Sequence, residues 1–248
     1  KYNAGISAEK DPGEEWFGGS NKSFDYVSAY AQRKSTGFLN NIILGDFNAN
    51  FGQGLVIWSG FAPGMSSLAT NISKQKGRFS KYSSFNENQY LRGIASTFHT
   101  ENVDVSLFFS NKQRDANTTV NDSAGKAIIV SSLQNTGLHA LQNEINDEDA
   151  LGERIFGTNA NLDFRNFNFG GTLTFLEYSA TIEKSDELYN FYSFTGKNLI
   201  SGSINYQVDG RRWSFFGETA RNNMKGIATF NGLTIELISE VNMAIAHR

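Results

Sequence analysis

The chain has 248 residues, 39% hydrophobic and 13% aromatic, and it contains no cysteine. The lack of cysteine excludes disulfides, thiolate metal sites and thiol nucleophiles. A formal net charge of -3 gives no basic field to attract nucleic acid. No apolar run approaches the roughly 18 residues of a membrane-spanning helix. Membrane-spanning strands are not excluded, because alternation dilutes their apolar residues.

Alternation of apolar and polar residues predicts eleven strands. Frequent phenylalanine and glycine, with only 2 prolines, suit β structure with tight reversals. In chain order we expect strands at residues 2–8, 24–34, 39–58, 88–99, 102–112, 153–165, 167–178, 192–208, 211–221, 226–238 and from 241 onward.

The strand expected at 39–58 is the longest and contains "NNIILGDFNANFGQGLVIW". Its apolar parity carries Leu39, Ile43, Phe47, Ala49, Phe51, Leu55 and Ile57, and its polar parity carries Asn40, Asp46, Asn48 and Asn50. Soluble strands usually have about five or six residues, whereas tilted strands that cross hydrocarbon need about ten. Gly45, Gly52 and Gly54 keep the strand phase and do not match a phosphate-binding loop.

Short turns alternate with long polar connections along the chain. Tight turns are expected near residues 36–37, 101, 166, 209–210 and 239–240, and the longest connections at 9–23, 59–87 and 113–151. In an antiparallel meander, alternate connections emerge at opposite ends of the sheet. Outer-membrane barrels have this asymmetry, with short periplasmic turns and long external loops.

The apolar parity continues through most later strands, for example Val103, Val105, Leu107 and Phe109. The facing is ambiguous only at residues 24–34 and 88–99. A soluble β-sandwich would alternate as well. Long strands, a polar parity rich in Asn, Ser and Thr, and charges gathered in the loops favour lipid over water on the apolar side.

We therefore predict an all-β fold, an antiparallel up-and-down transmembrane β-barrel. Residues 1–248 would form part of a single barrel domain. Because single-chain bacterial barrels usually have an even number of strands, the odd count of eleven predicts a fragment truncated at both ends.

Several stretches occur in an order typical of one family: "GDFNANFGQGLVIWSGFAPGMSS", "SSFNENQYLRGIA", "SSLQNTGLHALQNEINDEDALGERIFG" and "GRRWSFFGETARN" followed by "GIATFNGL". Across nearly its whole length the chain resembles the barrel portion of helix-hairpin-helix-containing outer-membrane proteins of Bacteroidota. The resemblance implies a transmembrane barrel at the bacterial outer membrane and implies no mechanism. Helix-hairpin-helix modules are not visible in this sequence, so we expect no nucleic-acid binding by these residues.

The polar parity supplies the candidate lumen-facing residues: Asp46, Asn48, Asn50, Asp104, Asn159, Asn161, Asp163, Asn205 and Glu218. The facing of Arg33, Arg92 and Arg212 is open. If the lumen is open, these charged side chains would influence which solutes pass. If they pair with one another, their role would be structural. A second set, expected as an aromatic girdle or alternatively as the lining of a ligand site, comprises Trp58, Phe61, Tyr82 and Tyr90.

We expect no catalytic residue, metal or cofactor. His99, His139 and His247 have no metal-site spacing, and the serines are not in a nucleophile motif. The acidic cluster at residues 144–153 lacks the spacing of a calcium loop. Residues 133–151 form either a short helix over the barrel mouth or an irregular loop.

These observations favour an outer-membrane barrel protein that serves as a channel, a transport element or an anchor for a periplasmic helix-hairpin-helix module outside this chain. Its main partner would be the lipid bilayer. The alternatives are a soluble all-β binding protein, either a sandwich or lipocalin-like, and an outer-membrane hydrolase with no nominated residues.

Overall fold

The computed structural model describes residues 1–9, 24, 26–59, 72–74, 78–84, 86, 88–123, 125–134, 147–191 and 193–248. These residues form one sheet of 14 strands and a short 3-10 helix, η2 (Leu188–Asn190). The predicted all-β, antiparallel, up-and-down architecture is confirmed. In the described part of the chain, no helix has the length and apolar content needed to cross a membrane.

Each of the eleven predicted strands is present in the sheet. They pair consecutively as β1 (Tyr2–Glu9), β2 (Tyr26–Lys34), β3 (Leu39–Ala49), β5 (Leu91–Thr100), β6 (Val103–Arg114), β9 (Leu151–Phe164), β10 (Phe167–Ile182), β11 (Gly196–Asp209), β12 (Trp213–Asn222), β13 (Ile227–Ile238) and β14 (Val241–His247). The register is continuous along most of these pairs, with a bulge between Glu177 and Ile182 of β10.

Three short strands lie in connections that were expected to be loops. β4 (Phe79–Lys81) pairs with β3, and β7 (Ala116–Asn121) forms a hairpin with β8 (Ala127–Leu133). β8 also runs parallel to the last residues of β10, at Thr181 and Ile182, past the end of the β9–β10 ladder at Tyr178. β4 was missed because three residues cannot show a period, and β7 (ANTTVN) and β8 (AIIVSSL) were missed because their apolar and polar residues do not alternate.

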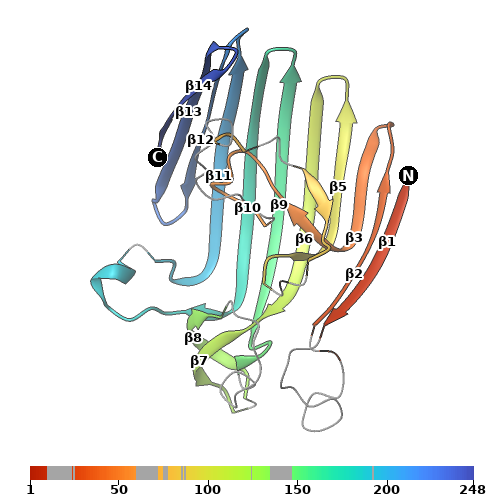
Figure 1. The fold of residues 1–248 in the computed structure, drawn as a ribbon. Coiled ribbons are helices and arrows are strands. Elements are labelled where there is room, and N and C mark those ends of the chain that lie inside the picture. Colours follow the sequence, from red (N-terminus) through yellow and green to blue (C-terminus); the bar gives the residue numbers. More distant parts are fainter. Residues whose placement is uncertain are drawn as a thin grey trace.

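The sheet is curved and open. In Figure 1 the strands form a trough with β1 and β14 at its two edges. Five strands lie between β3 and β12, yet Gln53 just after β3 contacts Glu218 of β12, so the sheet bends far enough for its walls to be bridged. The predicted tight turns lie at one end of the strands and the long connections at the other, where the short β12–β13 turn also lies (Figure 1).

The register defines two faces, because residues directly opposite on neighbouring strands share a face. We call one the inner face; a representative row on it is Thr97, Ser106, Asn159, Thr172 and Ser203. We call the other the outer face; the adjacent row on it is Ser96, Leu107, Thr158, Leu173 and Gly202.

Candidate functional site

The long strand expected over residues 39–58 ends at Ala49. Gly52 and Gly54 have φ angles of +56° and +79°, which turn the chain out of the sheet. The chain then returns, and Asn50 forms an isolated antiparallel bridge with Trp58. The expectation that these glycines keep strand phase was therefore wrong. We call residues 50–58 the inward segment.

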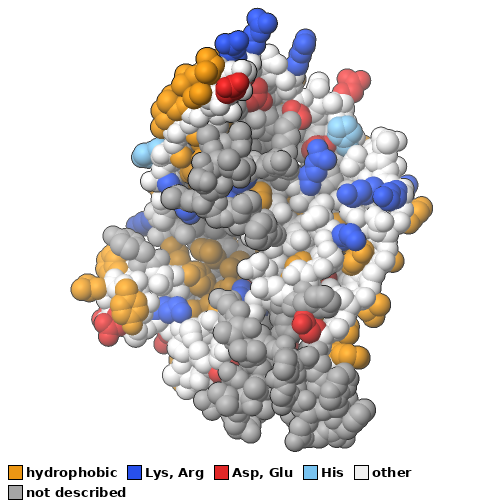
Figure 2. Space-filling view, in the orientation of Figure 1, with side chains coloured by type: hydrophobic (Ala, Val, Ile, Leu, Met, Phe, Trp, Pro, Cys, Tyr) orange, Lys and Arg blue, Asp and Glu red, His pale blue; other side chains and the backbone are white. Residues whose placement is uncertain are grey.

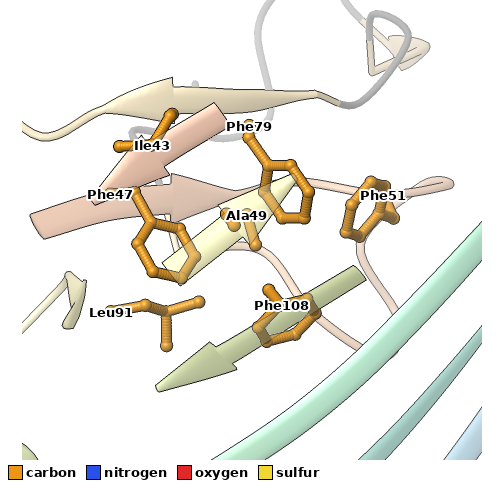
Figure 3. Close-up of a cluster of buried hydrophobic side chains, with 8 residues drawn as sticks. Ile43, Phe47, Ala49, Phe51, Phe79, Leu91 and Phe108 are labelled. Atoms are coloured by element: carbon orange, nitrogen blue, oxygen red, sulfur yellow. The ribbon is translucent and has the colours of Figure 1, made fainter. Parts of the chain in front are cut away.

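The apolar parity of β3 lies on the inner face, contrary to expectation. Ile43 pairs with Gln32 and Ala95, and all three are buried. The buried cluster comprises Ile43, Phe47, Ala49, Phe51, Phe79, Leu91, Ala95 and Phe108 (Figure 3). The apolar residues of β3 can face inward because the inward segment and β4 place Phe51 and Phe79 over this part of the inner face. The ring centroids of Phe51 and Phe79 are 5.2 Å apart.

The inward segment is bound to the far wall by Glu218. This side chain is fully buried, and its Oε2 accepts hydrogen bonds from the backbone N–H of Gln53 at 2.6 Å and of Leu55 at 3.1 Å. A Cβ at Gly52 would lie 2.8 Å from the carboxylate, so the close approach requires glycine. Glu218 was a predicted lumen residue, but this contact across 165 positions had no sequence signal.

Lys74 supports the same segment. Its N–H donates to Gln53 Oε1 at 2.9 Å, and its Nζ lies 4.4 Å from the Trp58 ring centroid. Burial lowers the pKa of Lys74 below its ordinary value, and the Glu218 carboxylate opposes this effect. The inward segment is thus packed by Phe51 at one end and held by Glu218 and Lys74 near its tip.

Asp46 and Arg92 fill a split in the sheet. The β2–β3 ladder ends at Tyr30 and Gly45. Beyond it, Asp46 Oδ2 accepts from the N–H of Ala29, and Arg92 donates to the carbonyl of Val27. Arg92 also donates to both Asp46 oxygens at 2.7 and 2.9 Å. This buried carboxylate therefore replaces backbone ladder bonds.

The other predicted lumen residues are placed as follows. Asn48 and Asn50 lie at the Ser59 end of the inward segment, where Asn50 Oδ1 accepts from the N–H of Ser59 at 3.1 Å. The remaining five lie in adjacent rows of the inner face: Asp104, Asn159, Asn161, Asp163 and Asn205. The register thus brings most of the predicted residues together.

Those five residues line a cavity of about 240 Å³ between the sheet and the inward segment. Its remaining polar lining includes Asn41, Gln53, Thr97, Ser106 and Gln207, together with the cationic Lys34, Lys74 and Arg78. Gly170 gives room for two amides, because a Cβ there would lie 2.5 Å from Asn161 Oδ1 and 2.9 Å from Asn205 Oδ1. The cavity is chemically hydrophilic and rich in amides and hydroxyls.

The three described residues expected as a girdle, Trp58, Tyr82 and Tyr90, do not lie in an exposed belt. Tyr82 and Tyr90 are buried together with Tyr26. Trp58 is half-buried beneath Lys74, and Phe61 lies outside the described residues. Tyr82 and Tyr90 lie in the connection after β3 and are buried by packing with Tyr26. Strand periodicity gives no information about how this connection folds.

Aromatic rows are instead found on the outer face. One row, toward the long connections, carries Phe109, Phe156 and Phe175. Another, at the short turns, carries Phe164, Phe167 and Phe215. Large apolar side chains between them are exposed, including Leu173 at 53% and Ile204 at 55%. Along the margins of the molecule, hydrophobic side chains project outward (Figure 2).

A polar row ends this apolar surface at the side of the long connections. Asn111, Arg154, Glu177 and Asn198 face one another in register, one row beyond Phe109, Phe156 and Phe175. Arg154 and Glu177 are 3.8 Å apart and largely exposed. The outer face is therefore apolar in its middle and charged at this boundary.

A second buried charge cluster lies at the inner face, apart from the inward segment. Glu153 Oε2 accepts from Arg114 Nη1 at 3.2 Å and from Tyr178 at 3.4 Å. The next inner residue across the ladder, Lys112, donates to the carbonyl of Asn88 at 3.1 Å. Arg114 and Glu153 form an ion pair, Lys112 is held by a backbone carbonyl, and together they support the strand ends near the long connections.

Among the described residues, no group of three or more His, Asp or Glu side chains could hold a metal ion. His99 pairs with Asp104 at 2.6 Å, and His247 ends β14 opposite Asn231. His139 and most of the loop expected as helical or irregular lie outside the described residues. In the acidic cluster, Asp147 accepts from Gln134 and Glu153 is paired as above.

No protein-family model matches the chain, and a search of curated proteins finds no match.

Proposed function

We propose that this chain is part of an outer-membrane β-barrel, with its outer face against acyl chains and its inner face lining a hydrophilic lumen. It would act as a channel or transport element, or as a membrane anchor for a periplasmic helix-hairpin-helix module. The single observation that carries the proposal is the outer face: an exposed apolar surface between two aromatic rows, closed at one side by a polar row.

The spacing of the two aromatic rows fits a bilayer. Phe156 and Phe164 of β9 are eight positions apart, which is about 26 Å along a strand. At the usual tilt of about 35–45°, this spans about 19–22 Å across the membrane, close to the apolar band of about 25 Å in known barrels. The rings themselves add to this height and would sit at the two interfaces.

The inner face supports a wet lumen. Buried polar atoms on it have no hydrogen-bond partner among the described residues, namely Asn168 Nδ2, Ser203 Oγ, Asn205 Oδ1 and Glu218 Oε1. Water normally satisfies such groups. A soluble sandwich or lipocalin-like barrel would instead bury the apolar parity, whereas Phe156, Leu173 and Ile204 are exposed.

Nitroxide labels on introduced cysteines test this proposal, because the chain has no native cysteine. Labels at Phe109, Phe169 and Ile235 should be accessible to oxygen and shielded from a water-soluble nickel chelate when the protein is in phospholipid vesicles. Labels at Thr172 and Ser203, on the inner face, serve as the matched controls. A protein that stays monodisperse in plain buffer, with the three outer labels immobilised in a core, would refute the proposal.

A further inference from the structure

The inward segment spans the inner face rather than lying along one wall. It leaves the sheet after Ala49 of β3, and its tip meets Glu218 of β12 through two backbone N–H groups. In Figure 1 the segment lies within the curve of the sheet. Any solute that moves along the inner face must therefore pass beside it.

The contact with Glu218 is built for a carboxylate. Its Oε2 accepts both N–H groups, and the charge-assisted bonds are stronger than those to a neutral acceptor. Gly52 supplies the left-handed conformation and the space that the carboxylate occupies. The other end of the segment is packed through Phe51 against Phe79 and Phe108. Loss of Glu218 would thus detach the tip from β12, leaving it in contact with Lys74, while the base stays in place.

One cavity beside the segment is small and hydrophilic, and a second, of about 170 Å³, lies against Leu55 and Val56. The cavity of about 240 Å³ is lined on the sheet side by amides and hydroxyls such as Ser106, Asn159, Asn161 and Asn205, and on the other side by Phe51, Gly52 and Gln53. Amides and hydroxyls both donate and accept hydrogen bonds. The same lining also holds charges of both signs, Lys34, Lys74 and Arg78 with Asp104 and Asp163, so it suits small hydrophilic solutes.

We propose that Glu218 is the positioning residue of a lumen constriction. By holding the inward segment across the inner face, its carboxylate limits passage to small hydrophilic solutes, and release of the segment admits larger ones. This inference rests on the proposed function, because it needs a membrane-embedded lumen.

Swelling of liposomes that contain the protein tests the inference, with arabinose, glucose, sucrose and stachyose as neutral probes of increasing size. In Glu218→Ala we expect sucrose and stachyose to enter several-fold faster than in the unmodified protein, with a smaller change for arabinose. The matched control is Glu153→Ala, which removes another buried inner carboxylate, one held by Arg114 and Tyr178 rather than by the inward segment, and should leave the size limit unchanged.

A conservative substitution separates a positional role from a loss of folding. Glu218→Gln keeps the length of the side chain and an oxygen that can accept from the backbone N–H groups of Gln53 and Leu55. This variant should keep a size limit close to that of the unmodified protein, so sucrose and stachyose should enter more slowly than in Glu218→Ala.

The outcomes are distinguishable. Protein that inserts into the liposomes overturns the constriction, and leaves the barrel proposal standing, if Glu218→Ala shows the size limit of the unmodified protein or if Glu218→Gln loses that limit as fully as Glu218→Ala. Protein that alkaline carbonate extracts from the liposomes overturns the barrel proposal itself.

Discussion

At the residue scale, aromatic rings on the inner face are accommodated by glycines on the neighbouring strand. Phe108 lies opposite Gly157, and Phe216 opposite Gly232. A Cβ at Gly157 would lie 2.2 Å from the Phe108 ring, and one at Gly232 would lie 2.4 Å from the Phe216 ring. A ring lying flat over a glycine can thus be buried in a row of otherwise small polar side chains.

Gly157→Ala should therefore destabilise the fold. The new methyl group must displace the fully buried Phe108 ring, and such overpacking costs about 1–3 kcal/mol. The midpoint of urea unfolding in detergent micelles or vesicles measures the effect. Gly202→Ala is the control, because its nearest neighbour would be 3.6 Å away, and its midpoint should hardly move. Equal midpoints for both variants would show that the ring can move freely.

Asp46 gives a second prediction at this scale. Asp46→Asn should lower the free energy of unfolding by about 1–3 kcal/mol. The Asp46 side chain is only 1% exposed, and the substitution removes the charge that accepts hydrogen bonds from Arg92 and from the N–H of Ala29. The control is Glu177→Gln in the exposed pair Arg154–Glu177, which should change the free energy of unfolding by only about 0.5 kcal/mol. Comparable losses in the two variants would mean that Asp46 does not substitute for ladder bonds.

At the element scale, strand positions and the tight turns could be predicted, since they depend on local period and turn chemistry. β3 shows the limit of that reasoning. Its alternation was read correctly, but its face was not, because the face depends on Phe51 and Phe79 returning from the following connection. The Glu218 contact joins residues 165 positions apart, and no local pattern encodes it.

β10 provides the element-scale prediction. Its outer residues run from Phe167 through Leu173 to Phe175 and end at Glu177. Leu173→Arg should destabilise the vesicle-inserted protein by about 2–4 kcal/mol, because arginine deep in the apolar band is costly. Asn198→Arg, in the polar row beside Glu177, should cost about 0–1 kcal/mol. Urea titration in vesicles measures both, and equal costs would argue against a hydrocarbon layer between the aromatic rows.

At the scale of the whole molecule, the two ends of the sheet differ. Turns of a few residues close one end, whereas the connections at the other end include the β7–β8 hairpin and the η2 turn (Figure 1). Leu188 of η2 is 95% exposed. In the proposed barrel this asymmetry fixes the orientation, because long connections face outward from the cell and short turns face the periplasm.

Epitope tags test this orientation in cells that express the protein. A tag inserted after Asp186, beside the exposed η2 turn, should bind antibody on intact cells, because that connection would extend beyond the polar row of Asn111, Arg154, Glu177 and Asn198. A tag inserted after Asp209, in the tight turn between β11 and β12, should bind only once the outer membrane is permeabilised. Both insertions lie in exposed connections and should be tolerated equally by the fold. The reverse pattern would invert the orientation, and labelling of neither tag on intact cells would place the long connections inside the envelope.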